Sequence, residues 1–94
     1  MRKLIVWPGI SRRIGACGLA HDGLLRFLNG LRSDLENHYR IYCVVRDPED
    51  PRYFRYLVTF ADGGSMHEFD FVIDDSTSPD HLFIEDFEHD SNPV

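Results

Sequence analysis

The sequence predicts an α+β fold in which an N-terminal strand and two helices precede a four-stranded antiparallel meander that packs on the helices. Three observations lead to this fold class. The last third of the chain holds three successive segments in which apolar and polar residues alternate, as they do in half-buried strands. The connections between these segments are too short for a crossover helix, which favours antiparallel pairing. Ahead of them lies a segment with apolar residues at helical spacing, which could cover one face of the sheet.

The three strands of the last third are predicted at Tyr53–Phe60, His67–Ile73 and Leu82–His89. In the second of them, Phe69, Phe71 and Ile73 alternate with Glu68 and Asp70. An Asp-Gly-Gly run separates the first two strands, and a seven-residue polar loop separates the last two. Both connections are rich in residues that favour turns, so the strands are expected to form consecutive hairpins.

The elements before the meander are predicted from capping residues and periodicity. Arg2–Trp7 is predicted as the opening strand, ended by a Pro-Gly turn pair. A short helix is predicted over Ile10–Leu19, with Ser11 as its cap. The main helix is predicted over about Gly23–Asn37, where leucines recur every three or four residues and Asp22 is a candidate N-cap.

Between the main helix and the meander, Ile41–Val45 is β-branched and aromatic, which predicts a short fourth strand. The two prolines that follow it cannot donate to a ladder, so they predict a turn. A chain of 94 residues has room for one small core. We therefore expect a single domain over residues 1–90 and a flexible tail over residues 91–94.

The cysteines and the N-terminus bear on localisation. Cys17 and Cys43 lack the close spacing of a metal site or a redox motif, which predicts reduced thiols and a cytoplasmic protein. The apolar run Leu4–Trp7 is much shorter than a signal-peptide core or a membrane span. We therefore expect no association with a membrane.

Charge is distributed unevenly along the chain. Residues 1–60 hold all ten basic residues and six acidic ones, whereas residues 61–94 hold ten acidic residues and no basic one. Such asymmetry indicates a charged partner, or one part of the fold complementing another. Acidic side chains spread around the meander would favour mere solubility, whereas acidic side chains on one face would favour recognition.

Several kinds of chemistry are weakly indicated. His67, His81 and His89 lie among many carboxylates, and this content makes a small metal-dependent hydrolase a third alternative. No pair of them has a recognised ligand spacing, so we expect no metal and no cofactor. Arginines and tyrosines could together form an RNA-binding patch, although the acidic meander would repel a nucleic-acid backbone. The residues of this patch would be Arg12, Arg13, Arg26, Arg32, Arg40, Arg46, Arg52, Arg55, Tyr39, Tyr53 and Tyr56.

The chain resembles the RelE/ParE superfamily of small toxins from bacterial toxin–antitoxin pairs. Members have a leading strand, two helices and a curved antiparallel meander. The segments Tyr53–Val58, Glu68–Asp75 and Leu82–Asp90 are similar to the three meander strands of that family. The resemblance therefore implies a RelE-like arrangement of the predicted α+β fold.

Site residues follow from the resemblance position by position. Arg55 matches an arginine that faces RNA in nuclease members, and His89 matches a histidine at the end of the last strand, so these two are the candidate catalytic residues. Glu68 and Asp90 stand where the family has arginines. A carboxylate cannot stabilise the negative charge that develops during RNA cleavage, which argues for a degenerate nuclease or a ParE-like role.

The resemblance predicts the toxin component of a type II toxin–antitoxin system. Its partners would be a cognate antitoxin, and the ribosome with mRNA or DNA gyrase as target; a homodimer through an exposed edge strand is a further expectation. The alternative is a non-enzymatic acidic binding module, such as an immunity protein or a phage-type inhibitor. The candidate partner-binding residues are Glu68, Asp70, Glu85 and Asp86.

Overall fold

A computed structural model describes residues 2–42 and 45–93, with side chains for all of these except residues 40–42. The α+β class and the order of elements, one strand, two helices and four strands, are confirmed. The elements are β1 (Lys3–Val6), α1 (Pro8–Gly15), α2 (His21–Tyr42), β2 (Val45–Arg46), β3 (Tyr53–Asp62), β4 (Ser65–Asp74) and β5 (His81–Pro93).

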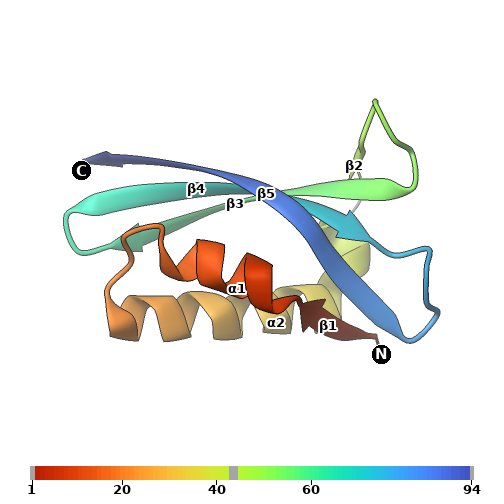
Figure 1. Ribbon diagram of the computed structural model, residues 1–94, viewed down its shortest axis with the longest axis horizontal. Helices are drawn as coiled ribbons and strands as arrows, with labels where there is room; N and C mark the ends of the chain where they lie inside the picture. The colour runs from red at the N-terminus through yellow and green to blue at the C-terminus, as the bar shows by residue number, and fades with distance from the viewer. Residues whose placement is uncertain (1, 43–44, 94) are drawn as a thin grey trace.

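All the strands form one mixed sheet, in the order β1-β5-β4-β3-β2. Strands β2 to β5 are antiparallel to their neighbours, and β1 lies parallel to β5, with Leu4 opposite Leu82. The first strand thus adds an edge to the predicted meander. Figure 1 shows both helices on the same side of the sheet. We call this side of the sheet the inner face and the opposite side the outer face.

The core lies between α2 and the inner face. Phe69 and Phe71 of β4 are fully buried, and the ring of Phe27 on α2 stacks on Phe69 with 4.5 Å between centroids. Leu31 and Leu35 follow Phe27 along the helix at a spacing of four residues and are also buried. The periodicity of the main helix and the alternation of the strands therefore meet in one cluster.

A β-bulge interrupts the pairing of β4 with β5. Val72 lies opposite Asp86 and Ile73 lies opposite Ile84, so Glu85 has no partner of its own. Because of this extra residue, Ile84 and Phe87 are both buried although three positions separate them. The bulge thus decides which residues of β5 reach the outer face beyond it.

The helix starts differ from the predicted ones. Helix α1 begins at Pro8, with Trp7 at the N-cap position and Ser11 inside the helix, because proline fits the first helical position. Helix α2 begins at His21, so Asp22 lies in its first turn rather than at the cap. The carboxylate of Asp62 on β3 instead accepts a hydrogen bond from the backbone N–H of Ala20, the residue before the helix start.

The predicted strand at Ile41–Val45 is wrong at its first two residues. Helix α2 continues through Tyr42, past non-helical dihedral angles at His38 (φ −131°, ψ 27°). Within that extension, Tyr39 packs edge-on against Phe54, 6.0 Å between centroids, a tertiary contact that outweighs strand propensity. Residues 43–44 lie outside the described residues, and β2 covers only Val45–Arg46.

The C-terminal end also differs from expectation. The sequence predicted a tail at residues 91–94, but β5 continues to Pro93, with Ser91 opposite His67 and Asn92 opposite Met66. Strand β4 is long enough to form backbone hydrogen bonds with these residues, so they continue the strand. Position 94 lies outside the described residues.

Among the helices that the structure describes, none is long and apolar enough to cross a membrane.

Two glycines of α2 provide a matched test of how the helix packs on the sheet. A Cβ at Gly23 would lie 2.3 Å from Oδ1 of Asp62, whereas a Cβ at Gly30 would meet nothing within 4 Å. We expect Gly23→Ala to lower the free energy of unfolding by about 1–3 kcal/mol, because the side chain of Asp62 must move. Gly30→Ala should raise it by up to about 1 kcal/mol. Denaturant titration of both variants checks this, and equal effects would contradict it.

Candidate functional site

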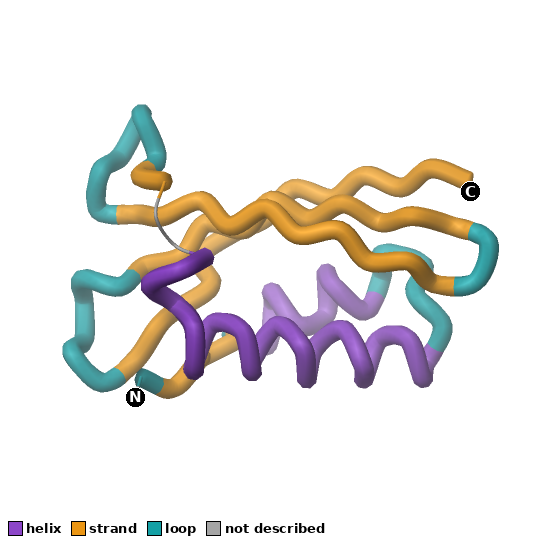
Figure 2. Tube along the Cα trace, turned by 180° about the vertical axis from the view of Figure 1, so that it is seen from behind, coloured by secondary structure: helices purple, strands orange, loops and turns teal. Residues whose placement is uncertain are grey.

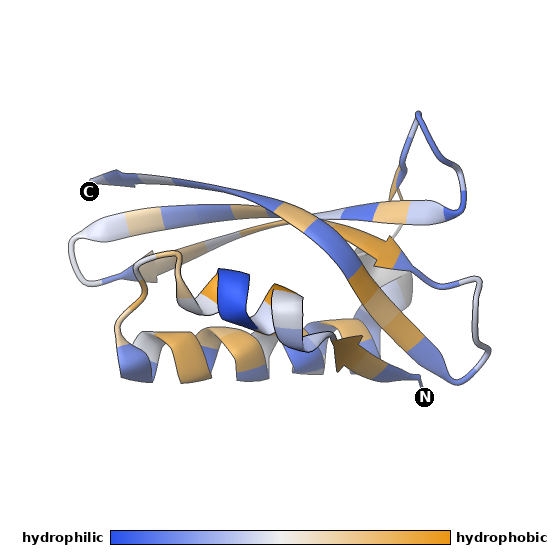
Figure 3. Ribbon diagram, viewed as in Figure 1, coloured by the Kyte–Doolittle hydropathy of each residue, from blue (hydrophilic) through white to orange (hydrophobic). Residues whose placement is uncertain are grey.

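Four carboxylates gather on the outer face of the sheet. Glu68 and Asp70 of β4 lie directly opposite Asp90 and Glu88 of β5. Their strand neighbours at 67, 69, 71 and 87 are buried on the inner face, so alternation puts these acids on the other side. Figure 3 shows the corresponding hydrophilic bands along β4 and toward the C-terminal end of β5. We call Glu68, Asp70, Glu88 and Asp90 the acidic face.

The acidic face borders a shallow hollow. The hollow has a volume of about 240 Å³ and is lined by Leu57, the four acids and His89. Leu57, on β3 opposite Asp70, is 69% exposed. An exposed leucine among carboxylates offers a partner both apolar contact and negative charge.

Only one acid of the acidic face is neutralised within the described part of the chain. Arg55 of β3 donates to both oxygens of Asp70, from Nε at 3.0 Å and Nη2 at 2.6 Å. These hydrogen bonds raise the pKa of Arg55, and Asp47 lies 3.4 Å from its Nη1. Among the described residues, Glu68, Glu88 and Asp90 have no ion-pair partner.

The arrangement costs stability. Directly opposed side chains in an antiparallel pair have Cβ atoms about 5 Å apart, and like charges there are destabilising. The acidic face contains two opposed pairs, Glu68 with Asp90 and Asp70 with Glu88. Arg55 neutralises Asp70, so the repulsion without compensation is that between Glu68 and Asp90. Packing does not require them, since three of the four side chains are on exposed residues. The fold therefore tolerates repulsion at this position.

The two candidate catalytic residues are not brought together. Arg55 lies on the outer face, whereas the ring of His89 lies 4.7 Å from that of buried Phe69 on the inner face. His89 contacts His67 instead, with 2.9 Å between Nε2 of His89 and Nδ1 of His67. His67 is 3% exposed. The sequence did not predict this histidine pair, which depends on the β4–β5 register.

The other two candidate partner-binding residues lie apart from the acidic face. Glu85 is the unpaired residue of the bulge. Asp86 accepts a hydrogen bond from Arg13 of α1 at 2.7 Å, which is the main reason that its pKa is lowered. Of the predicted acids, only Glu68 and Asp70 belong to the acidic face. Glu88, Asp90 and Leu57 complete it, and strand pairing would have been needed to find them.

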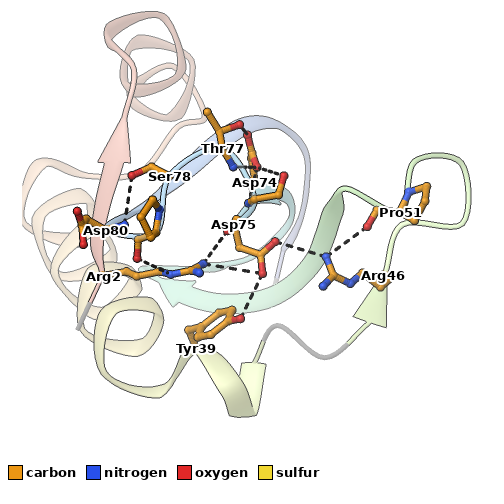
Figure 4. Close-up of polar contacts among 11 residues, drawn as sticks. Arg2, Tyr39, Arg46, Pro51, Asp74, Asp75, Thr77, Ser78 and Asp80 are labelled. Carbon is orange, nitrogen blue, oxygen red and sulfur yellow. Dashed lines mark hydrogen bonds and ion pairs between the residues drawn. The ribbon is translucent and has the colours of Figure 1, made fainter.

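A second polar cluster joins four parts of the chain at the other end of the sheet (Figure 4). The carboxylate of Asp75 accepts hydrogen bonds from Tyr39 at 3.2 Å and Arg46 at 3.4 Å, and Arg2 donates to its backbone oxygen at 2.8 Å. Each group in this cluster has a protein partner. The cluster is therefore a structural clasp for β1, α2, β2 and the β4–β5 loop.

The loop after β4 is a turn. Burial raises the pKa of Asp74, but hydrogen bonds from Thr77 and Ser76 outweigh it and leave the pKa lowered. Its carboxylate accepts from both backbone N–H groups and both hydroxyl groups, as in an Asx turn. Within the described residues, no group of three or more His, Cys, Asp or Glu side chains could hold a metal ion.

The arginines are mostly engaged within the fold. Seven of them form ion pairs with carboxylates: Arg2, Arg13, Arg26, Arg32, Arg46, Arg52 and Arg55. Five of these pairs, including Arg13 with Asp86 and Arg26 with Asp62, join the basic first part of the chain to its acidic last part. The predicted charge complementarity within the fold is thus confirmed. Three acids of the acidic face, Glu68, Glu88 and Asp90, are among those that form no ion pair with a described residue.

The chain matches no protein-family model, no curated protein sequence and no solved structure. Function must therefore be inferred from the residues themselves.

The histidine pair predicts a pH dependence of stability. Burial lowers the pKa of His89, and the nearby His67 lowers it further, against an opposing effect of Asp90. Between that lowered value and the unfolded value of about 6.5 the unfolded chain binds more protons, so stability should fall as the pH drops below about 6.5. Denaturant titrations across pH 5–8 measure this.

His89→Phe should flatten the dependence, because the ring keeps its contact with Phe69 but cannot be protonated. His21→Gln removes a histidine outside the pair and serves as the matched control. An unchanged pH profile in His89→Phe would contradict the assignment.

Proposed function

We propose that this protein is a non-enzymatic binding module whose acidic face docks on a basic surface of another protein. The observation that supports it is the placement of two opposed carboxylate pairs around exposed Leu57. Acids needed only for solubility can lie anywhere on a surface. These acids instead lie next to one another, in an arrangement that costs the folded state stability.

The geometry indicates the chemistry of the partner. Arg55 already neutralises Asp70, so the charge that remains lies along Glu68, Glu88 and Asp90. Lysine or arginine side chains entering the hollow would relieve the repulsion between these acids and gain ion pairs. An apolar group of the partner would cover Leu57. Such a surface gives fast, salt-sensitive association and discriminates against acidic proteins.

A matched pair of charge variants tests the role of the acidic face. Glu68→Gln/Asp90→Asn removes two charges from it, and Glu49→Gln/Asp80→Asn removes two charges from exposed positions elsewhere. The tagged full chain is used to capture proteins from a cell extract, with elution by increasing salt. We expect basic proteins to be retained by the wild type and the control but lost, by about tenfold or more, from the acidic-face variant.

Equal loss in both variants would show that only net charge matters and would contradict the proposal. Retention that does not respond to salt would contradict the electrostatic basis of the interaction.

A second candidate is the toxin component of a type II toxin–antitoxin system, with a RelE-like arrangement of strands. It is supported by the element order, one strand, two helices and then strands β2 to β5, together with the meander segments that resemble that family. An antitoxin would then be the partner, and gyrase rather than mRNA the target, because Arg55 and His89 lie on opposite faces of the sheet.

The toxin candidate predicts growth arrest on induced expression in a bacterial host that lacks an antitoxin. Arg55→Ala and His89→Ala should leave that arrest unchanged if gyrase is the target, and abolish it if RNA cleavage is. Normal growth at an expression level verified by immunoblot would contradict the candidate.

A further inference from the structure

An exposed aromatic stack lies at the end of β1, on the outer face of the sheet. Phe83 of β5 lies between Leu82 and Ile84, which are buried on the inner face, so alternation turns Phe83 outward. The indole ring of Trp7 stacks on Phe83, with 5.4 Å between centroids and 8° between planes. Figure 2 shows both helices on the inner side of the sheet, and Trp7 is 47% exposed. The indole is thus held by one ring and open to a partner on its other side.

Elsewhere in the described part of the chain, arginines lie over aromatic rings. Five guanidinium groups lie 3.7–5.5 Å from a ring centroid: Arg2 over Tyr39, Arg13 over Phe87, Arg26 over Phe60, Arg46 over Phe54 and Arg52 over Tyr53. Each of these five arginines also forms an ion pair with a carboxylate. A ring close to a carboxylate is therefore the usual arginine site within this fold.

The same two groups occur at Trp7 without an arginine. Tryptophan offers a cation the most favourable ring face, yet no cation of a described residue lies over Trp7. Val6 of β1 is paired with Ile84 of β5. Trp7 and Glu85 are the next residues of these two segments and are therefore neighbours. Glu85 is exposed and forms no ion pair with a described residue.

We propose that Trp7 and Glu85 bind an arginine side chain of the basic protein that docks on the acidic face, an inference that rests on the proposed function. The guanidinium group stacks on the open side of the indole and donates hydrogen bonds to the carboxylate. Arginine fits this site better than lysine, because a guanidinium group is planar, weakly hydrated and stacks on aromatic faces. Glu85, which the bulge separates from the acidic face, is then part of the same docking surface.

One partner can reach both parts of this surface. Glu85 and Glu88 are three residues apart on β5, which is about 10 Å along a strand. An extended segment of about four residues, or about two turns of a helix, covers this distance. A partner with arginines at that spacing occupies the acidic face and Trp7 together, whereas lysines make full use of the acidic face alone. The surface should therefore prefer arginine-rich to lysine-rich partners.

The test uses the full chain and two peptides of about eight residues, one alternating arginine with glycine and the other alternating lysine with glycine. The peptides have equal charge and, when extended, are long enough to cover both parts of the surface. Binding is measured at low salt by the fluorescence anisotropy of labelled peptide. We expect the arginine peptide to bind about two- to fivefold more tightly than the lysine peptide. Because the chain has one tryptophan, its emission reports contact at Trp7 directly, and the arginine peptide should change it.

Trp7→Leu keeps an apolar side chain but removes the aromatic face. The side chain of Trp7 makes no capping hydrogen bond at the start of α1, so the helix should be kept. We expect this variant to bind the arginine peptide no more tightly than the lysine peptide. Leu25→Ala changes an apolar side chain of similar exposure on α2 and should bind both peptides like the wild type. If Trp7→Leu fails to fold by circular dichroism, the tryptophan emission of the wild type decides.

The outcomes separate this inference from the proposed function. Suppose that the arginine peptide binds the wild type and is lost from Glu68→Gln/Asp90→Asn, but leaves the emission of Trp7 unchanged or binds equally to Trp7→Leu. The inference is then overturned, and the proposed function stands. If neither peptide binds, both are contradicted. Emission that changes with the concentration of the protein alone would assign Trp7 to a contact between copies and would also overturn the inference.

Discussion

The structure depends on the alternation of β4, the central strand. Phe69 and Phe71 must reach Phe27 of α2 on the inner face, and this contact leaves Glu68 and Asp70 no position except the outer face. A slip of one residue would bury both carboxylates and expose both rings. The position of the acidic face is thus a direct consequence of the packing of the core.

The same alternation of β4 also determines which acidic side chains can pair with arginines. Acids at the ends and borders of the sheet meet arginines from the first part of the chain, as Asp75 does with Arg2 and Arg46, and Asp86 with Arg13. The acids of the acidic face point away from the helices and from the arginines that the helices carry. Among the residues that the structure describes, Arg55 of β3 is the basic side chain that pairs with one of them, Asp70. The remaining charge is available to a partner.

Local pattern was sufficient for the α+β class, for the main helix and for the strands, whose ends lie within a few residues of their predicted positions. It failed where long-range contacts decide. Tyr39 holds the end of α2 against β3, so a β-branched segment stays helical. The bulge at Glu85 shifts the parity of β5, and no local pattern reveals such a shift. Glu85 and Asp86, which the sequence suggested as partner-binding residues, lie apart from the acidic face, whereas Glu88 and Asp90 belong to it.

The central claim is that folding holds like charges directly opposite each other on the outer face. A double-mutant cycle on Glu68→Gln and Asp90→Asn, in which the free energy of unfolding of each variant is measured at low salt, isolates this interaction. We predict that each single variant is more stable than the wild type, by a few tenths to about 1 kcal/mol. The double variant should gain less than the sum, since each substitution relieves the same repulsion. Destabilised single variants, or strictly additive effects, would contradict the account.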